Sequence, residues 1–538
     1  MPASARSTPD LSLNSAVRDA GARMRLDEIA ALLRPPDLRG REPGADPIEV
    51  TDLAYDSHRV VPGSLFFCRR GSADDGHRHA PAAVAAGALA LVCETPMGLG
   101  VPELVVPDAR AAMNLLAAPF FGHPSRSLVL AGVTGTNGKT TVAYMLDAIF
   151  RVAGETTGLI GTVETRLPGA SIPGSRTTPE SVDLQRLLRR MVDTGVGFCV
   201  MEVTSIGLDQ GRVEGAEFGV AIFTNLTQDH LDYHGDLESY YRAKRALFVP
   251  ERTALAVVNV DDPYGARLVR ELVDVPCLTY GLDATPAGPS VAVGLVADVR
   301  AVAVTGDPGG STFTLAGRVD GRVLEQPVQL RLPGRFNVAN ALSAATAAAA
   351  LGAPIEAIAE GLRTMPRIPG RFDLVDEGQG FAVVVDYAHT PDGLGRVLAA
   401  ARDLSRPDSH GERPRVIAVF GCGGDRDRGK RPLMGRAAAE HADIVYVTSD
   451  NPRGEPPEAI IAEIETGIAP AAPRLGYHLV PDREEAIAQA IAEARPGDVV
   501  VIAGKGHETT QSFRNRVVAF DDSVVAAACL QRLAGGHR

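Results

Sequence analysis

A glycine-rich stretch that contains one lysine has the composition of a phosphate-binding loop. The segment 131–146 reads AGVTGTNGKTTVAYML, in which an apolar run leads into a polar loop with Lys139 and then into a helical pattern. Backbone amides at such a strand-to-helix turn can surround phosphate oxygens, the lysine adds a cation, and Thr140 can bind Mg²⁺. The common template has a further glycine where this chain has Val133, so the glycine pattern is a shorter one. We predict a nucleotide site here; an ordinary glycine-rich turn is the structural alternative.

Acidic and imidazole side chains at two further strand ends could bind a metal ion beside the phosphates. Glu202 ends the apolar run FCVME, and the segment TNLTQDHLDYHG at 224–235 follows another apolar run and contains His230. Ligands of parallel α/β sheets bind at the carboxyl ends of the strands, so a carboxylate and an imidazole could meet there and hold Mg²⁺. Taken alone, His230 is more often a capping or core residue, and it is the phosphate loop that favours the ligand role.

Four polar loops in the last third of the chain each follow an apolar β run. They are DYAHTPDGL at 386–394, GCGGDRDRGKRPLM at 421–434, TSDNPRGE at 448–455 and AGKGHE at 503–508. At one edge of a sheet these loops would form a binding face, and their arginines and lysines favour an anionic ligand. By contrast, Lys244 lies in the amphipathic pattern SYYRAKRALF, and from the residues alone we interpret it as solvent-exposed.

The chain divides into three α/β domains. Short apolar runs alternate with helical patterns over 25–124, and a β–loop–α repeat over 125–365 indicates a parallel sheet of the phosphate-loop ATPase type, covered on both faces. The second block ends in period-two alternation over about 290–332, which predicts antiparallel strands, and in an alanine-rich helix at 337–352. After the linker MPRIPGRF, four β runs predict a doubly wound, Rossmann-like domain over 366–538.

The composition favours a soluble globular protein. Of 538 residues 45% are hydrophobic and 22% are charged, and the net charge of −12 argues against nucleic-acid and anionic-membrane partners. The six cysteines are far apart and form no C-x-x-C pair, which suits a reducing compartment. Residues 1–24 lack the apolar core of a signal peptide and read as a disordered tail, and no apolar stretch is long enough to span a bilayer. We therefore expect a cytoplasmic monomer without membrane insertion.

A series of long motifs occurs in the order seen in the Mur ligase family. They are YDSHRVVPGSLFF, DDGH, TGTNGKTT, MEVTS, TNLTQDHLDYHG, YRAKRALF, LPGRFNVANAL, VVDYAHTPD, FGCGGDRDRGKRPLMG, SDNPRGE and AGKGHE. The chain resembles this family over about residues 25–535. The resemblance implies an ATP-dependent amide ligase of peptidoglycan synthesis, with domains for a uridine nucleotide, for ATP and for an incoming amino acid. Its substrate would be UDP-N-acetylmuramoyl-L-alanyl-D-glutamate, whose γ-carboxylate ATP would activate as an acyl phosphate.

The resemblance also implies a role for each residue that matches a family motif. ATP would contact Gly135, Thr136, Asn137, Gly138, Lys139, Thr140, Thr141, Asn340, Arg371, Asp386 and His389. The UDP portion of the UDP-linked substrate would contact Ser57, Ser72, Ala73 and Asp74, and its sugar and peptide would contact Thr177, Thr178, Thr204, Gln210 and Arg212. The amino acid would contact Arg426, Asp450, Asn451, Pro452, Arg453, Gly504 and Glu508. The catalytic residues would be Lys139, Lys244, Glu202 and His230, and Mg²⁺ would bind Thr140, Glu202, His230 and Lys244.

For Lys244 the resemblance reverses the interpretation drawn from the residues alone. The family carries the matching lysine as an N-carboxylysine, in which a CO₂-derived carbamate turns a cation into an anion able to bind Mg²⁺. Two stretches depart from the common family pattern. Ile206 stands where an imidazole is usual, and His58 stands where an arginine is frequent, so these positions receive no role.

The identity of the amino acid depends on the loop at 450–453. Family members add meso-diaminopimelate or L-lysine, and diaminopimelate has one more carboxylate. A guanidinium can grip a carboxylate through two parallel hydrogen bonds, so Arg453, with Arg426 on a neighbouring loop, predicts meso-diaminopimelate. Surface pairing of Arg453 with Glu455 is the alternative. The alternative functions are an L-lysine-adding ligase, the ligase that adds the next dipeptide, a folylpolyglutamate synthetase and a nucleotide-dependent switch that only hydrolyses ATP.

Overall fold

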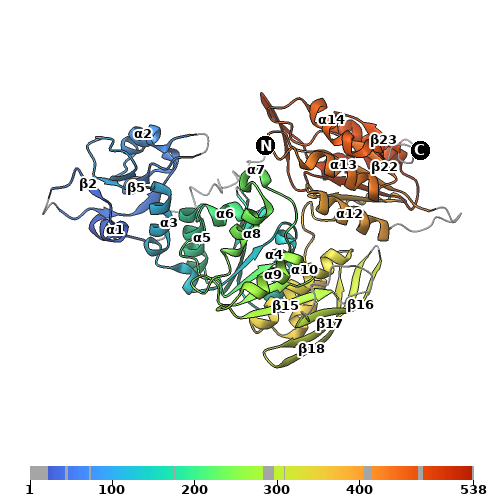
Figure 1. Ribbon diagram of the computed structural model, residues 1–538, viewed down its shortest axis with the longest axis horizontal. Helices are drawn as coiled ribbons and strands as arrows, with labels where there is room; N and C mark the ends of the chain where they lie inside the picture. Colours follow the sequence, from blue (N-terminus) through green and yellow to red (C-terminus); the bar gives the residue numbers. More distant parts are fainter. Residues whose placement is uncertain are drawn as a thin grey trace, which may run out of the picture. The chain divides into compact units, whose positions relative to one another are not determined.

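A computed structural model describes residues 22–42, 46–71, 74–174, 176–282, 296–307, 309–404, 413–470 and 476–535 (Figure 1). The chain forms two compact units. The first contains Met1–Gly132, Glu155–Ala221 and Ala246–Leu255, and the second contains Val133–Gly154, Ile222–Arg245 and Ala256–Arg538. Both units are α/β structures with parallel sheets, as the sequence predicts. The domain boundaries placed after residues 124 and 365 stay predictions.

The first unit contains a five-stranded sheet of order β2-β7-β6-β5-β4. Strands β4 to β7 are parallel, and β2 is antiparallel to β7. Successive side chains of a strand point to opposite faces, so Leu65 and Phe67 lie in one apolar core while Phe66 lies in another. Both faces are therefore covered, by α1 and α3 on one side and α2 on the other. The bounds are α1 (Leu26–Leu33), β2 (Asp37–Arg39), β4 (Asp52–Ala54), β5 (Ser64–Phe67), α2 (Ala80–Ala85), β6 (Ala90–Cys93), β7 (Glu103–Val105) and α3 (Ala109–Phe120). A short pair, β1 (Met24–Arg25) with β3 (Glu49–Val50), lies beside them.

The first unit also contains strands in the order β11-β10-β9-β12-β8. β12 is parallel to β9, whereas β10 is antiparallel to both β9 and β11. The sequence predicts β8 and β12 but not the three short strands between them. The bounds are β8 (Val129–Thr134), β9 (Thr157–Ile160), β10 (Glu164–Leu167), β11 (Ala170–Pro173), α5 (Ser181–Asp193), β12 (Phe198–Glu202) and α6 (Ser205–Asp209).

The second unit contains the last residues of β8 and of β13, and its further strands follow in the order β14-β15-β16-β17-β18. β14 to β16 are parallel, and β16 to β18 are antiparallel, which confirms the predicted period-two region for its described part. The predicted alanine-rich helix is α10, whose small side chains let it be buried on nearly all sides. The bounds are α4 (Lys139–Val152), β13 (Val220–Phe223), α7 (Leu231–His234), α8 (Leu237–Arg245), β14 (Ala256–Asn259), α9 (Pro263–Glu271), β15 (Cys277–Leu282), β16 (Val299–Asp307), β17 (Gly310–Val319), β18 (Arg322–Leu330), α10 (Arg335–Ala350) and α11 (Ile355–Thr364).

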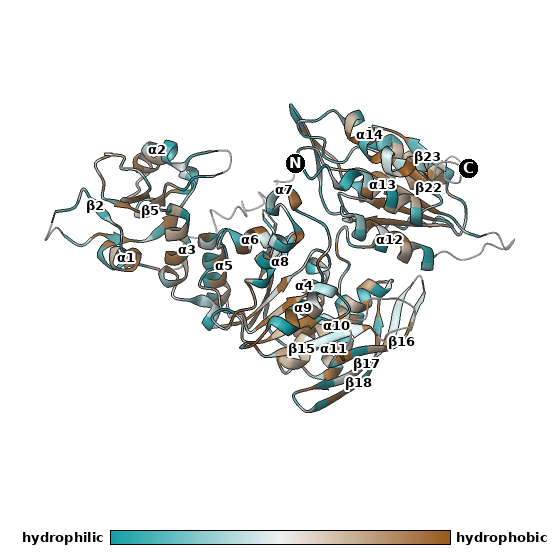
Figure 2. Ribbon diagram, viewed as in Figure 1, coloured by the Kyte–Doolittle hydropathy of each residue, from teal (hydrophilic) through white to brown (hydrophobic). Residues whose placement is uncertain are grey.

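The C-terminal part of the second unit has a six-stranded sheet of order β19-β20-β24-β21-β22-β23. All strands but β19 are parallel, and the four predicted β runs are β20, β21, β22 and β24. These strands are brown in Figure 2 because valine and isoleucine fill them. The bounds are β19 (Asp373–Leu374), β20 (Ala382–Asp386), α12 (Pro391–Leu404), β21 (Val416–Phe420), α13 (Lys430–His441), β22 (Ile444–Val447), α14 (Pro457–Ile468), β23 (Gly476–Leu479), α15 (Arg483–Glu493), β24 (Val499–Ala503), β25 (Thr510–Phe513), β26 (Arg516–Ala519) and α16 (Asp522–Gly535). Among the described residues no helix combines the length and the apolar character that a membrane span requires.

Candidate active site

The predicted phosphate loop connects β8 to α4. Two of its glycines have positive φ, +150° at Gly135 and +90° at Gly138. A Cβ atom at Gly135 would lie 1.9 Å from Oγ1 of Thr224, and one at Gly138 would lie 2.4 Å from Oδ1 of Asn340. The backbone therefore needs glycine at both positions. Gly138 is the N-cap of α4 and has no side chain to cap the first turn, so an anion can approach the positive end of the helix.

Side chains of the segment after β13 hold this loop in shape. Asn225 accepts a hydrogen bond from the Asn137 backbone N–H on Oδ1 (3.0 Å) and donates from Nδ2 to the Asn137 carbonyl (3.1 Å). The Thr224 hydroxyl donates to the same carbonyl (2.6 Å), and the hydroxyls of Tyr240 and Thr136 lie 3.1 Å apart. The sequence motif TNLT quoted above thus has a supporting role that we did not predict.

Two lysines converge on one carbonyl oxygen of the loop. Lys139 Nζ donates to the carbonyl oxygens of Gly135 and Thr136, each at 2.8 Å. Lys244 Nζ donates to the same Gly135 oxygen at 2.8 Å and lies 4.6 Å from the centre of the Tyr240 ring. Lys244 is only 1% exposed, so its interpretation as a solvent-exposed residue is wrong. Burial, with the Lys139 charge as the second cause, lowers the pKa of Lys244 well below the usual value of a lysine.

His230 lies at the edge of this group. Its φ is +53°, a left-handed conformation that is uncommon outside glycine, and it is the N-cap of α7. The carboxylate of Asp229 is 3.4 Å from His230 Nε2 and 3.7 Å from His389 Nε2. Although 43% of the His230 side chain is exposed, desolvation lowers its pKa to about 4, and three neighbouring positive groups add to this while Asp229 opposes it. Above that pH the imidazole is neutral, which is the form that binds metals.

The C-terminal part of the second unit brings further predicted ATP residues to the loop. Arg371 donates to the Thr140 hydroxyl at 2.9 Å, and its guanidinium lies 4.4 Å from the centre of the Tyr387 ring. The Arg371 Nε atom is buried and has no hydrogen-bond partner within the described ranges. Asp386 accepts from the backbone N–H groups of Phe372 and Ala388, both at 2.7 Å, and burial raises its pKa. The orphaned guanidinium nitrogen beside the phosphate loop fits an anionic ligand such as a nucleotide.

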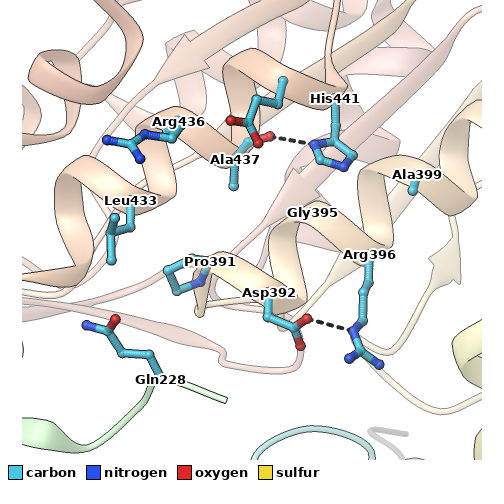
Figure 3. Close-up of a pocket in the computed structure, with 11 residues that line it drawn as sticks. Gln228, Pro391, Asp392, Gly395, Arg396, Ala399, Leu433, Arg436, Ala437 and His441 are labelled. Atoms are coloured by element: carbon cyan, nitrogen blue, oxygen red, sulfur yellow. Dashed lines mark hydrogen bonds and ion pairs between the residues drawn. The ribbon is translucent and has the colours of Figure 1, made fainter. Parts of the chain in front are cut away.

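A pocket of about 480 Å³ lies between α12 and α13, with Gln228 on its rim (Figure 3). Asp392 lines it and accepts from Arg396 at 2.8 Å, as the dashed line shows, while its other oxygen accepts from Asn137 Nδ2 at 3.0 Å. The wall of the pocket is therefore bonded to the phosphate loop. None of the residues predicted to bind a substrate lines it, and Asp392 received no predicted role although it ends the family motif VVDYAHTPD.

The predicted amino-acid loops meet at the carboxyl end of the C-terminal sheet. Asn451 donates to Glu508 at 2.7 Å and accepts from the Ser512 backbone N–H at 2.9 Å. Gly504 has φ +114°, and a Cβ there would lie 2.7 Å from an Asp450 oxygen. Asp450, Asn451, Gly504 and Glu508 are thus brought together, as predicted from the family motifs.

The cations of this face are fewer than the sequence suggests. Arg431 pairs with Glu455 and Glu463, each at 2.8 Å, and Lys505, which is fully buried, pairs with Glu508 at 3.0 Å. Because Arg431 occupies Glu455, the alternative pairing of Arg453 with Glu455 is not observed. Arg453 instead has a positive φ of +50° and donates to the carbonyl of Gly424 at 2.9 Å.

In the first unit, the residues predicted to hold the sugar and peptide lie around the end of β12. The hydroxyls of Thr178 and Thr204 are 3.0 Å apart, and Arg212 donates to the Thr178 carbonyl at 3.0 Å. Arg212 also donates to Gln210 at 2.7 Å. Glu202 is 1% exposed and accepts from the backbone and hydroxyl of Thr162 at 2.8 and 3.0 Å.

The other residues predicted to bind the UDP-linked substrate lie elsewhere in the first unit. Thr177 lies 3.0 Å from Thr162 through the two hydroxyls, and Ser57 begins a short 3-10 helix. Asp74 pairs with His79 at 2.6 Å. Ser72 and Ala73 lie outside the described residues. Four residues that we did not predict, Arg69, Arg110, Arg176 and Glu180, form an ion cluster with Arg212.

The side chains around the phosphate loop include groups that suit Mg²⁺. This ion prefers oxygen ligands and usually binds through one or two protein groups together with substrate phosphates and water. Among the described residues no three His, Cys, Asp or Glu side chains gather in a metal-binding cluster. A hydroxyl at Thr140 and a neutral imidazole at His230, beside a phosphate loop, fit the sparse protein ligation that an ATP-bound Mg²⁺ needs.

Comparison with known proteins agrees with this geometry. Three family models match: the Mur ligase family catalytic domain over residues 49–121, the Mur ligase middle domain over 133–348, and the Mur ligase glutamate ligase domain over 370–506. The chain therefore belongs to the Mur ligase family.

Several relatives of this chain share one activity in their names. The UDP-N-acetylmuramoyl-L-alanyl-D-glutamate--2,6-diaminopimelate ligase of Geobacillus thermodenitrificans is 46% identical over 495 residues, 91% of this chain and 96% of the relative. The ligase of the same name from Streptomyces avermitilis is 43% identical over 93% of this chain and 96% of the relative. A solved structure of that name has 32% identity and a TM-score of 0.62, covering 95% of this chain and 99% of that one. The ADP complex of the MurF ligase from Thermotoga maritima, at 18% identity and a TM-score of 0.59 over 90% of this chain and 96% of that one, shares the fold.

Proposed function

We propose that this chain is an ATP-dependent ligase that joins meso-diaminopimelate to the γ-carboxylate of D-glutamate in UDP-N-acetylmuramoyl-L-alanyl-D-glutamate. The observation that carries the proposal is the 46% identity, over 91% of the chain, to a ligase of that name. The phosphate loop and the cluster of loops around Asp450 and Glu508 supply the two binding regions that such a reaction needs. The L-lysine alternative finds no support among the names of the relatives.

The reaction follows from the chemistry of a carboxylate, which is a poor electrophile because its leaving group would be oxide. A γ-carboxylate oxygen attacks the γ-phosphorus of ATP, the bond to ADP breaks, and an acyl phosphate forms. The amine nitrogen of the amino acid then attacks the acyl carbon, and phosphate leaves. Lys139 binds the phosphates and offsets the charge that develops on the group in transfer. Arg371, whose Nε lacks a protein partner within the described residues, and Asn340 hold the nucleotide beside Lys139.

Thr140, His230 and Lys244 of the second unit would hold Mg²⁺, which neutralises phosphate charge when bound. The metal-binding role of Glu202, which lies in the first unit, stays a prediction. The Lys244 side chain fits a carbamate for two reasons. It is buried beside Lys139, where a second cation is unfavourable, and its lowered pKa yields the neutral amine that adds CO₂ with loss of a proton. The carbamate would supply an anion at this place.

Arg453 would select diaminopimelate through the carboxylate that lysine lacks. The αL backbone and the stiff Pro452 before it fix the direction of the side chain, and Arg426 lies on the neighbouring loop after β21. The cytoplasmic location and the monomeric state stay predictions.

The test is incubation with ATP, Mg²⁺ and the UDP-linked dipeptide against a panel of amino acids, with product mass and ADP release as readouts. We expect a tripeptide product with diaminopimelate, and ADP release only when both the UDP-linked dipeptide and an amino acid are present. ADP release that needs neither would identify a simple ATPase and contradict the proposal.

A further inference from the structure

An ion cluster in the first unit, buried except for the half-exposed Arg176, has far more positive than negative charge. Glu180, whose side chain is 1% exposed, stands at its centre. Arg110 and Arg176 each place a guanidinium nitrogen 2.9 Å from its carboxylate, Arg212 follows at 3.4 Å and Arg69 at 3.9 Å. One carboxylate faces four guanidinium groups, which leaves three positive charges without a protein counterion in the cluster.

Two of these arginines each have one hydrogen-bond donor that is not used within the described residues. The Nε atoms of Arg69 and Arg212 are buried and have no hydrogen-bond partner in the described part of the chain. Burial lowers the pKa of both guanidinium groups, and the neighbouring arginines act in the same direction while Glu180 opposes them. Buried charges in proteins are normally paired. An ion network that served stability alone would carry more carboxylates than this one does.

The guanidinium groups are nevertheless held in place. Arg69 lies 4.7 Å from the centre of the Tyr55 ring, a cation–π contact. Arg212 is fixed by its hydrogen bonds to the Thr178 carbonyl and to Gln210, at 3.0 and 2.7 Å. Glu180 is the N-cap of α5 but makes no capping hydrogen bond to its own helix, so its carboxylate serves the arginines. The cluster is pre-organised for a polyanion that the protein itself does not supply.

We propose that Arg69, Arg110, Arg176 and Arg212 bind the diphosphate of the nucleotide-sugar substrate and that Glu180 is the positioning residue that holds them. The inference rests on the proposed function and adds the group of the substrate that this cluster recognises. It follows from covalent order, because the diphosphate links uridine to the sugar. Arg69 follows β5 and lies in the chain between Ser57 and Asp74, both predicted to contact the UDP portion, and Arg212 is bonded to Thr178, predicted for the sugar and peptide. A diphosphate diester carries two negative charges, which three excess positive charges can hold, whereas a single carboxylate would leave the cluster underused.

The test compares the binding of UDP and of uridine by titration calorimetry, which needs no turnover. The variants are Arg69→Met, which keeps the stem over Tyr55, Arg212→Met and Glu180→Gln. We expect Arg69→Met and Arg212→Met to lose UDP affinity by at least about tenfold while uridine affinity changes less than about twofold, because each removes a positive partner of the bound diphosphate. Glu180→Gln removes a negative charge together with the common anchor of the arginines, so a loss of UDP affinity in this variant reports their positioning. UDP affinities of both arginine variants within twofold of the wild type would overturn the proposal.

Arg186→Met is the matched control. Arg186 is also a buried arginine on α5, but its guanidinium pairs with Asp52 at 2.8 Å and with the Leu53 carbonyl at 2.7 Å. We expect this variant to lower the thermal midpoint while the ratio of UDP to uridine affinity stays unchanged. If it lowers that ratio as much as Arg69→Met does, the cluster acts through stability and the proposal is wrong.

Two further measurements separate the possible outcomes. N-acetylmuramoyl-L-alanyl-D-glutamate has no diphosphate. If the Arg69 and Arg212 variants bind this compound more weakly than the wild type does but bind UDP equally well, the cluster is a carboxylate site and the proposal is overturned. In steady-state assays we expect Glu180→Gln to raise KM for the UDP-linked substrate by more than about tenfold with little change in KM for ATP. Failure of the wild type to form any tripeptide would remove the proposed ligase function, while the dependence of UDP binding on the cluster would still be measured.

Discussion

Replacing Lys244 by methionine tests the buried lysine pair most directly. Lys139 and Lys244 each place Nζ 2.8 Å from the Gly135 oxygen, so the two nitrogens are at most about 5.6 Å apart, twice that distance. At about 5 Å and an effective dielectric constant of about 20, two unit positive charges repel by about 3 kcal/mol. This repulsion lowers the pKa of Lys244 in the same direction as burial does. An anion at the end of Lys244 would reverse the sign of the interaction.

The expected results follow from this balance. In CO₂-free buffer the Lys244→Met variant should be at least as stable to urea as the wild type, because it loses a buried charge and keeps the apolar stem. Bicarbonate should stabilise the wild type and not the variant, since a carbamate forms only on the folded-state amine. The variant should lose about 10²-fold or more in kcat because it lacks the carbamate that would hold Mg²⁺ beside the transferring phosphoryl group. With ¹³C-labelled CO₂, the wild type should show a carbamate signal in NMR spectra that the variant lacks.

The pH dependence has a definite sign. The folded state holds Lys244 with a pKa below the unfolded value of 10.5, so the unfolded chain binds more protons between the two values. Stability in CO₂-free buffer should therefore fall as the pH decreases from about 10, and this slope should be smaller in Lys244→Met. A variant with near-normal kcat, or bicarbonate stabilisation equal in both proteins, would refute the reasoning.

Three further predictions concern the loops. Lys139→Ala should lower the rate of ADP release by about 10³-fold or more and change the affinity for the UDP-linked dipeptide less than about twofold. Near-normal ligation by this variant would contradict the assignment of the loop. Gly138→Ala should raise KM for ATP at least about tenfold and lower the free energy of unfolding by about 1–3 kcal/mol. The reason is that its Cβ would lie 2.4 Å from Asn340 Oδ1 at a φ of +90°. An unchanged KM would mean that the loop tolerates a side chain there. Arg453→Ala should lower the kcat/KM preference for diaminopimelate over L-lysine at least about thirty-fold, equivalent to about 2 kcal/mol. A wild type that prefers lysine, or a variant with unchanged preference, would contradict that role.

The elements that could be predicted from the sequence are those whose sequence pattern is local. Continuous apolar runs predicted β20, β21, β22 and β24, and glycine spacing predicted the phosphate loop, because each pattern lies within a few neighbouring residues. The strands of 157–173 escaped prediction because they are only four residues each, β10 and β11 carry polar side chains, and all three gain their order from pairing with neighbouring strands.

Ion pairs between side chains that are distant in the sequence could not be predicted. Arg431 reads as a free cation until the fold brings Glu455 and Glu463 to it from other elements. The cluster around Glu180 escaped prediction in the same way, since its arginines are spread from residue 69 to residue 212. Lys244 is different, because it follows the buried Tyr240 by four residues and so shares its helical face. That spacing is a signal which the amphipathic interpretation overlooked.

The burial of the lysines also determines which amines of the protein can react with electrophilic reagents. The chain has only four lysines, at 139, 244, 430 and 505. Three of them are buried and Lys139 is half-buried, so no lysine amine is exposed on the described surface. Arginine does not react with acylating reagents at neutral pH because its guanidinium stays protonated. Beyond the α-amino group, an acylating reagent would therefore find amines only at the predicted ATP and amino-acid loops, and nucleotide should protect Lys139 from it.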